Sequence, residues 1–100
     1  MTTSIFEFDL NTLDLDMATR PNGDRFLTDV LTALRSSDVV SITFGPKEPT
    51  PSFVDQCFGG LIATLGFEDF RRRVKLKNVS PSTRPLLLHV LARRAPQPAG

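Results

Sequence analysis

Ser52, Asp55 and His89 supply the three residue types of a nucleophilic catalytic triad. Their spacing argues against that chemistry. Asp55 lies three residues after Ser52, on the first turn of the same predicted helix, and His89 lies among leucines near the C-terminus. No Gly-x-Ser-x-Gly turn, which would expose a nucleophile at the end of a strand, surrounds the serine. We therefore interpret His89 as a residue at the boundary of the core and expect no enzymatic activity.

A metal or cofactor site would need residues that the sequence does not offer. One histidine and one cysteine are too few for a zinc site, and no Gly-x-x-x-x-Gly-Lys loop is present to hold phosphates. Cys57 falls on the apolar side of a predicted helix, so we interpret it as a core residue rather than a reactive thiol. A single cysteine forms no internal disulfide, which suits a reducing compartment. We expect no cofactor and no metal.

The neighbours of Ser52 make this serine more informative. The segment from Thr50 to Leu61 joins a predicted strand to a predicted helix and reads Thr-Pro-Ser-Phe-Val-Asp-Gln-Cys-Phe-Gly-Gly-Leu. Pro51 fixes its own φ and favours extended geometry at Thr50. Ser52 then suits the N-cap of the helix, with Asp55 as an acidic variant of a capping box. Two interpretations of Ser52 follow: a helix cap alone, or a phosphosite stabilised by the unpaired N–H groups of the helix end.

The same joint is the predicted contact site for a protein partner. The expected contact residues are Thr50, Pro51, Ser52, Phe53, Asp55 and Gln56. Phe53 directly follows the joint, so we expect that it could project outward as an anchor of the interface. Phe58, Phe67 and Phe70 are interpreted as core residues.

Alternation of apolar and polar residues predicts the strands. The opening segment, Ser4–Leu10, places Phe6, Phe8 and Leu10 on one side and charged residues on the other. Residues 38–44 are rich in β-branched side chains, as in a central parallel strand, and residues 73–77 alternate as a further strand. Residues 13–17 predict a short additional strand, or a hairpin with the first.

Helical spacing of apolar residues predicts three main helices. The first begins near Asn22, with Asn22 or Asp24 as its cap, and ends near residues 36–37. The second runs from Ser52 to about Leu65 and ends at Gly66. The last carries Leu86, Leu87, Val90 and Leu91, and a cap at Ser82 would place Pro85 in its first turn. Residues 67–70 predict a single helical turn.

Two glycines lie inside the second helix. Gly59 and Gly60 each cost about 1 kcal/mol relative to alanine in a helix interior. We therefore predict a close approach of this helix to the sheet or to a partner.

The order of these elements predicts an α/β fold. We expect a mixed, mostly parallel sheet of about four strands covered by three to four helices, with the opening strand antiparallel at one edge. Residues 1–94 are predicted to form a single domain, as suits a chain of 100 residues, and residues 95–100 a disordered tail.

The charges are nearly balanced, with 12 basic and 11 acidic residues and a net charge of +1. A local basic cluster comprises Arg71, Arg72, Arg73, Lys75 and Lys77, with Arg93 and Arg94 further along. We interpret it as a solvated strand edge, and the absence of Tyr and Trp makes nucleic acid an unexpected partner.

No apolar run approaches the roughly 20 residues of a membrane span, and no signal peptide pattern is present. We expect a soluble, cytoplasmic protein with no membrane partner.

Three segments together resemble the bacterial STAS-like domain of unknown function, a relative of the STAS fold of sulphate transporters and anti-sigma factor antagonists. They are Val39–Phe44, Thr50–Leu61 and Val74–Asn78, and the resemblance spans about residues 20–94. The Pro-Ser-Phe turn joined to the Phe-Gly-Gly helix is its most specific part. Thr43 stands where the family usually has an acidic residue at the end of the strand. Phe53 stands where the anti-sigma factor antagonists have a small residue after the phosphorylated serine.

The resemblance implies a STAS-like fold and a regulatory role without catalysis. In anti-sigma factor antagonists, the serine that corresponds to Ser52 is phosphorylated by a partner kinase, which releases the pair. A histidine-kinase-like ATPase is therefore one expected partner. The alternative function is a structural module that self-associates, as a homo-oligomer, through a sheet edge or through helix surfaces.

Overall fold

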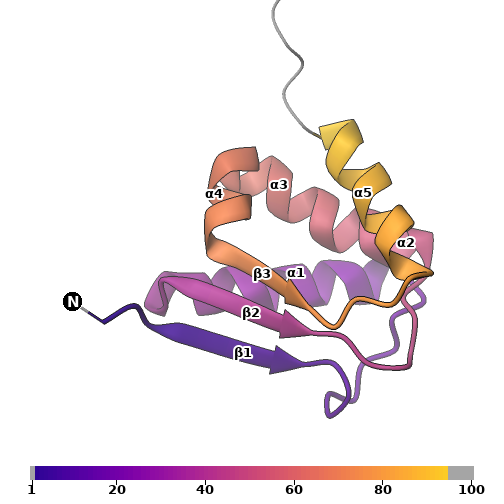
Figure 1. The fold of residues 1–100 in the computed structure, drawn as a ribbon, viewed down its shortest axis with the longest axis horizontal. Coiled ribbons are helices and arrows are strands. Elements are labelled where there is room, and N and C mark those ends of the chain that lie inside the picture. Colours follow the sequence, from indigo (N-terminus) through magenta and orange to yellow (C-terminus); the bar gives the residue numbers. More distant parts are fainter. Residues whose placement is uncertain (1, 95–100) are drawn as a thin grey trace, which may run out of the picture.

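The computed structural model describes residues 2–94. The elements of this part of the chain follow in the order shown in Figure 1: β1 (Ile5–Asp9), α1 (Arg20–Ser36), β2 (Val39–Thr43), α2 (Pro51–Val54), the π-helical turn η1 (Asp55–Gly59), α3 (Gly60–Leu65), α4 (Phe67–Arg73), β3 (Val74–Lys77) and α5 (Thr83–Arg94). The predicted tail, residues 95–100, lies outside the described residues.

The described strands form one sheet in the order β1-β2-β3, and all three are parallel. The α/β class is confirmed, with three strands rather than about four. The predicted antiparallel pairing of the opening strand was wrong, because Ile5 to Asp9 run parallel to Val39 to Thr43. The connection explains the difference: α1 returns the chain to the starting end of β1 before β2 begins, and such a crossover joins parallel strands (Figure 1).

Residues 13–17 form no strand, which corrects the prediction of a short additional one. Asp9 turns the chain directly after β1. Its carbonyl accepts hydrogen bonds from the amides of Thr12 and Leu13 at 3.1 and 3.2 Å, and its carboxylate accepts from the amide of Asn11 at 2.9 Å. The chain therefore leaves the sheet, and Met17 lies in the loop that follows, with its side chain buried in the core.

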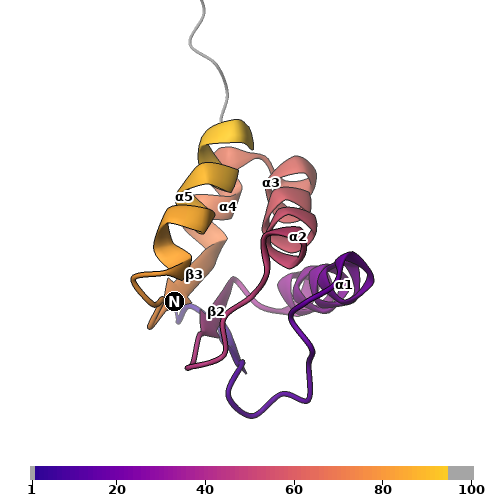
Figure 2. The same cartoon turned by 90° about the vertical axis from the view of Figure 1, so that its right-hand side faces the viewer.

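The two faces of the sheet differ. Val40, Ile42 and Val74 are buried on the face of the strands that the helices cover. Figure 2 shows the helices gathered on one side of the sheet. The opposite face carries charged side chains that are exposed, namely Glu7, Asp9, Lys75 and Lys77. Lys77 Nζ lies 3.7 Å from Glu7 Oε1 on this face.

Helix α1 begins earlier than predicted. Thr19, not Asn22 or Asp24, is its N-cap, and the Thr19 side chain accepts a hydrogen bond from the amide of Asn22 at 3.3 Å. Pro21 lies in the first turn, where a missing N–H leaves no partner unsatisfied. The cap is therefore the hydroxyl residue two positions before the proline.

The predicted second helix is present as three consecutive segments, α2, η1 and α3. It ends at Gly66 as predicted, with φ +85°, a backbone conformation that glycine adopts readily. Helix α4 then extends to Arg73, beyond the predicted single turn.

Helix α5 begins at Thr83, and Pro85 lies in its first turn as predicted. The serine that serves this end is Ser80 rather than Ser82. Ser80 Oγ accepts a hydrogen bond from the amide of Thr83 at 3.1 Å, and the Ser80 carbonyl accepts from the amide of Arg84 at 3.0 Å.

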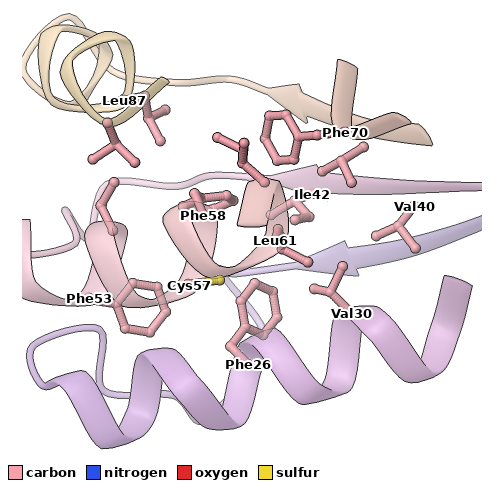
Figure 3. Close-up of a cluster of buried hydrophobic side chains, with 14 of the residues drawn as sticks. Phe26, Val30, Val40, Ile42, Phe53, Cys57, Phe58, Leu61, Phe70 and Leu87 are labelled. Carbon is pink, nitrogen blue, oxygen red and sulfur yellow. The ribbon is translucent and has the colours of Figure 1, made fainter. Parts of the chain in front are cut away.

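The core lies between the sheet and the helical layer, as Figure 3 shows. Phe44 of the segment after β2 stacks on Phe58 of η1 with ring centroids 6.1 Å apart, and Phe26 of α1 stacks on Phe53 of α2 at 6.3 Å. All four rings are fully buried. The helix that follows Ser52 is therefore held on one side by the sheet and on the other by α1.

Candidate functional site

Thr50, not Ser52, caps the helix that begins at Pro51. Thr50 Oγ1 accepts a hydrogen bond from the amide of Phe53 at 3.2 Å and donates one to the carbonyl of Ala18 at 2.9 Å. Thr50 has φ −76° and ψ 161°, the extended geometry expected before a proline. Pro51 is already helical, so Ser52 becomes the second residue of the helix and the predicted Ser52 cap was wrong.

Ser52 itself is half-buried at the first turn of α2. No hydrogen bond of its hydroxyl to another part of residues 2–94 is present, since Thr50 fulfils the capping role. The hydroxyl is therefore partly open to solvent at a helix end that carries partial positive charge.

Asp55 binds two arginines instead of completing a capping box. Its Oδ2 lies 3.0 Å from Nη1 of Arg20, the first residue of α1, and its Oδ1 lies 3.6 Å from Nη2 of Arg94, the last residue of α5. The hydrogen bond from Arg20, opposed by burial and assisted by the charge of Arg94, holds the pKa of the Asp55 carboxyl below its ordinary value of 3.8. We call Arg20, Asp55 and Arg94 the arginine–aspartate cluster.

The π-helical turn positions this cluster. It begins at Asp55 and ends at Gly59, and π-helical turns of this kind are frequent at functional sites. A Cβ atom at Gly59 would lie 3.1 Å from Nη2 of Arg94, so the glycine leaves room for the guanidinium over the helix. A Cβ atom at Gly60 would lie 2.6 Å from Cδ2 of Leu27 of α1. The predicted close approach at the glycines is therefore to α5 and α1, not to the sheet.

Phe53 is not an interface anchor, which corrects the expectation of an outward-facing ring. Its exposed fraction is 0%, and it points from α2 toward α1 (Figure 3). The reason is helical spacing, since Phe53 lies on the same buried side as Cys57 and Leu61 and packs on Phe26 of α1.

Gln56 also faces α1. Its Nε2 lies 3.4 Å from Oδ1 of Asp24. A Cβ atom added at Gly23 of α1 would lie 3.1 Å from the Cβ atom of Gln56. Of the six predicted contact residues, Pro51 is exposed, while Thr50, Ser52, Asp55 and Gln56 are half-buried. The joint therefore offers a small polar surface without an aromatic centre.

The other chemically active residue types are not brought together. His89 is exposed on α5, and no hydrogen bond joins it to Ser52 or Asp55 within residues 2–94. Cys57 is buried, as predicted, and burial raises the pKa of its thiol far above the ordinary value. No group of three or more His, Cys, Asp or Glu residues in the described part of the chain could hold a metal ion. No helix within residues 2–94 is long and apolar enough to cross a membrane.

The basic cluster is divided among several roles. Lys75 and Lys77 are exposed on the sheet, in line with a solvated edge, and Arg72 pairs with Asp69 at 2.6 Å. Arg73 is different, because its guanidinium donates to the carbonyls of Leu34, Ser37 and Asp38 at 2.7 to 3.0 Å. That side chain fixes the end of α1 rather than forming part of a solvated patch.

A surface depression of about 450 Å³ is lined by residues 14–18 together with Lys47 and Glu48, and none of the six predicted contact residues lines it. The sequence alone does not predict that Arg20 and Arg94 pair with Asp55. Arg20 and Arg94 lie on other elements, 35 and 39 residues away, and no local pattern links them to Asp55.

Three parallel strands packed against helices, with a hydroxyl residue at the joint between β2 and its following helix, define an α/β domain. The family described as STAS-like domain of unknown function matches residues 22–84, and the chain belongs to this family. No curated protein and no solved structure matches the chain.

Proposed function

We propose that this STAS-like domain is a non-catalytic protein-interaction domain, and that its partner binds over the first turn of α2 and the arginine–aspartate cluster. The observation that carries the proposal is the division of labour between Thr50 and Ser52. Thr50 caps the helix, so the Ser52 hydroxyl is free to be modified without loss of the cap.

The proposed switch is phosphorylation of Ser52 by a kinase-like ATPase partner. A phosphoserine carries about −1.5 to −2 charges and three strong acceptor oxygens. Residues three apart on a helix are neighbours, so a phosphate on Ser52 would lie on the side of the helix that carries Asp55. It would compete with Asp55 for Arg20, whose side chain is 54% exposed and can turn toward it. The modified surface would differ in both charge and shape.

The test is a pull-down from the native host with wild type, Ser52→Ala and Ser52→Glu as baits, read by mass spectrometry. We expect a protein held by wild type and Ser52→Ala and lost with Ser52→Glu. Ser82→Glu is the matched control, because Ser82 is an exposed serine before α5 and should leave the partner bound. Equal recovery of every captured protein with wild type and Ser52→Glu would refute a switch at this joint.

Phosphorylation is tested separately. The purified domain is incubated with the captured partner and ATP, and its intact mass is measured. We expect an addition of one phosphate to wild type and none to Ser52→Ala. A phosphate that persists in Ser52→Ala would place the modification elsewhere and contradict this part of the proposal.

A further inference from the structure

Strand β1 exposes two large apolar side chains at the edge of the sheet. Ile5 is 59% exposed and Phe6 is 44% exposed, and Leu88 on α5 is the third such residue in the described part of the chain. β1 is an edge strand because the sheet order is β1-β2-β3. Neither a proline nor an inward-pointing charge protects this edge against pairing with another strand.

The backbone of β1 also has free hydrogen-bonding groups on this side. The carbonyl of Ser4 accepts from the amide of Val39, and the amide of Leu10 donates to the carbonyl of Thr43, so the even-numbered residues bond toward β2. Ile5 and Glu7 therefore direct their N–H and C=O groups away from β2. Within residues 2–94 no strand lies beside them.

A surface depression runs along this edge between β1 and α1. Its volume is about 310 Å³, and it is lined by Phe6, Phe8, Asp29, Thr32, Ala33 and Ser36. A second depression of about 340 Å³ shares Asp29 and continues along α1 past Asp14 and Asp16. The phenylalanine rings supply an apolar floor, and the continuation is acidic.

The charges that line the two depressions have one dominant sign. Asp14, Asp16 and Asp29 line them, against one basic side chain, Arg25. On the uncovered face of the sheet, β1 contributes Glu7 and Asp9, both exposed, and Glu7 also lies 3.7 Å from Nζ of Lys77 on β3. A neighbouring strand with basic side chains on that face would meet them as cross-strand pairs of opposite charge.

We propose that β1 and α1 bind an extended segment of a partner protein in which apolar residues alternate with lysine or arginine. The segment adds to the free edge of β1 as a further strand, through the N–H and C=O groups of Ile5 and Glu7. Its apolar side chains enter the depression beside Phe6, and its basic side chains lie beside Glu7 and Asp9.

Charge favours this occupant over a second copy of the domain. Two β1 strands paired antiparallel, about a two-fold axis normal to the sheet, would place the acidic rows of both copies on one face of the joined sheet, which is unfavourable. The proposed surface is separate from Ser52, so it goes beyond the switch proposed above.

The test measures fluorescence anisotropy with a labelled octapeptide of alternating valine and lysine. We expect saturable binding to the wild-type domain and none for a peptide of alternating valine and glutamate. Phe6→Ser should weaken binding by about tenfold or more, as for the loss of a central apolar contact. Leu88→Ser is the matched control, since it removes an exposed apolar side chain elsewhere, and should stay within about twofold of wild type.

Amide hydrogen exchange with and without the valine–lysine peptide locates the contact. We expect the amides of Ile5 and Glu7 to gain protection, because strand addition would bond them. Equal binding of the two peptides, equal binding by wild type and Phe6→Ser, or unchanged exchange at both amides would overturn the proposal.

Light scattering of the domain alone tests whether a second copy of the domain binds this edge instead of a partner segment. A mass that doubles with concentration in wild type but not in Phe6→Ser would assign this edge to a second copy and overturn the proposal. Ser52→Glu should bind the peptide within about twofold of wild type, because Ser52 lies outside the two depressions. Failure here therefore leaves the Ser52 switch standing, and failure of the pull-down leaves this surface standing.

Discussion

Pro51 sets the geometry of the two hydroxyl side chains on either side of it. It holds Thr50 in extended geometry, where the threonine oxygen meets the amide of Phe53. It also places Ser52 inside the helix, where the serine does not act as the cap. Helix α1 is also capped by a threonine close to a proline, although Arg20 stands between Thr19 and Pro21. In both places the cap is a hydroxyl residue on the N-terminal side of the proline.

Alanine substitution should separate the two hydroxyls. We expect Thr50→Ala to lower the free energy of unfolding by about 1 kcal/mol, because the helix loses its cap. Ser52→Ala should stay within about 0.5 kcal/mol of wild type. Urea denaturation followed by circular dichroism measures both. A larger loss in Ser52→Ala than in Thr50→Ala would show that the serine is the cap after all.

Asp55 should make stability depend on pH. Its pKa is lowered in the folded protein, so its contribution is present above the unfolded value near 3.8 and is lost as the pH falls through the lower folded pKa. At pH 7 we expect Asp55→Asn to lower the free energy of unfolding by up to about 1 kcal/mol, given its partial exposure. This deficit should shrink as the pH is lowered below about 4.

Urea denaturation of wild type and Asp55→Asn between pH 7 and pH 2.5 checks this trend. Asp69→Asn is the control, because Asp69 pairs with Arg72 on the exposed surface of α4 and should change stability by less than about 0.5 kcal/mol. A deficit of Asp55→Asn that grows on acidification would contradict the assigned direction of the pKa.

At the scale of elements, the helix from Pro51 to Leu65 was predictable in extent but not in detail. Apolar spacing gives its buried side, and Gly66 gives its end, since both are local properties of the sequence. The π-helical turn depends on contacts with α5 and α1, which Gly59 and Gly60 permit. No spacing within the helix encodes those partners.

Gly66 ends this element in a backbone conformation that other residues rarely adopt. Its φ of +85° with ψ of 155° lies in a region that is essentially restricted to glycine. We expect Gly66→Ala to lower the free energy of unfolding by about 1 to 3 kcal/mol through backbone strain, since no atom within 4 Å would clash with the added carbon. Thermal and urea denaturation measure the loss. Thr64→Ala, on the exposed side of α3, is the control and should not destabilise the domain.

At the scale of the molecule, the positions of β2 and β3 were predictable and the direction of β1 was not. The alternation of apolar and polar residues shows which residues form a strand and which face of the sheet each side chain occupies. The pattern is the same for a parallel and an antiparallel strand, so it does not give the direction of the strand. The direction follows from α1, which spans the distance between β1 and β2. The arginine–aspartate cluster likewise joins α1, η1 and α5, so it exists only in the assembled domain.

Arg73 links distant parts of the molecule and should matter for the whole fold. It lies at the junction of α4 and β3, yet its guanidinium donates to three carbonyls at and beyond the end of α1. We expect Arg73→Lys to lower the free energy of unfolding by about 1 to 2 kcal/mol, because an ammonium group cannot reproduce the planar fork. Arg72→Lys, at the neighbouring exposed position, should stay within about 0.5 kcal/mol. Comparable losses in the two variants in urea would argue against this role.

The all-parallel sheet has a consequence for the order in which the domain folds. Val39 pairs with Ile5 and Val74 pairs with Val40, so each neighbouring pair of strands joins residues 34 positions apart. No hairpin can nucleate such a sheet, and closing each long loop costs entropy before any strand contact forms. Local helical turns form within about a microsecond, whereas the strands must wait for α1 and then for the segment from α2 to α4 to bring them together. We therefore expect the strands to pair only after local helical turns have formed, and β1 to be without its neighbour until α1 has docked.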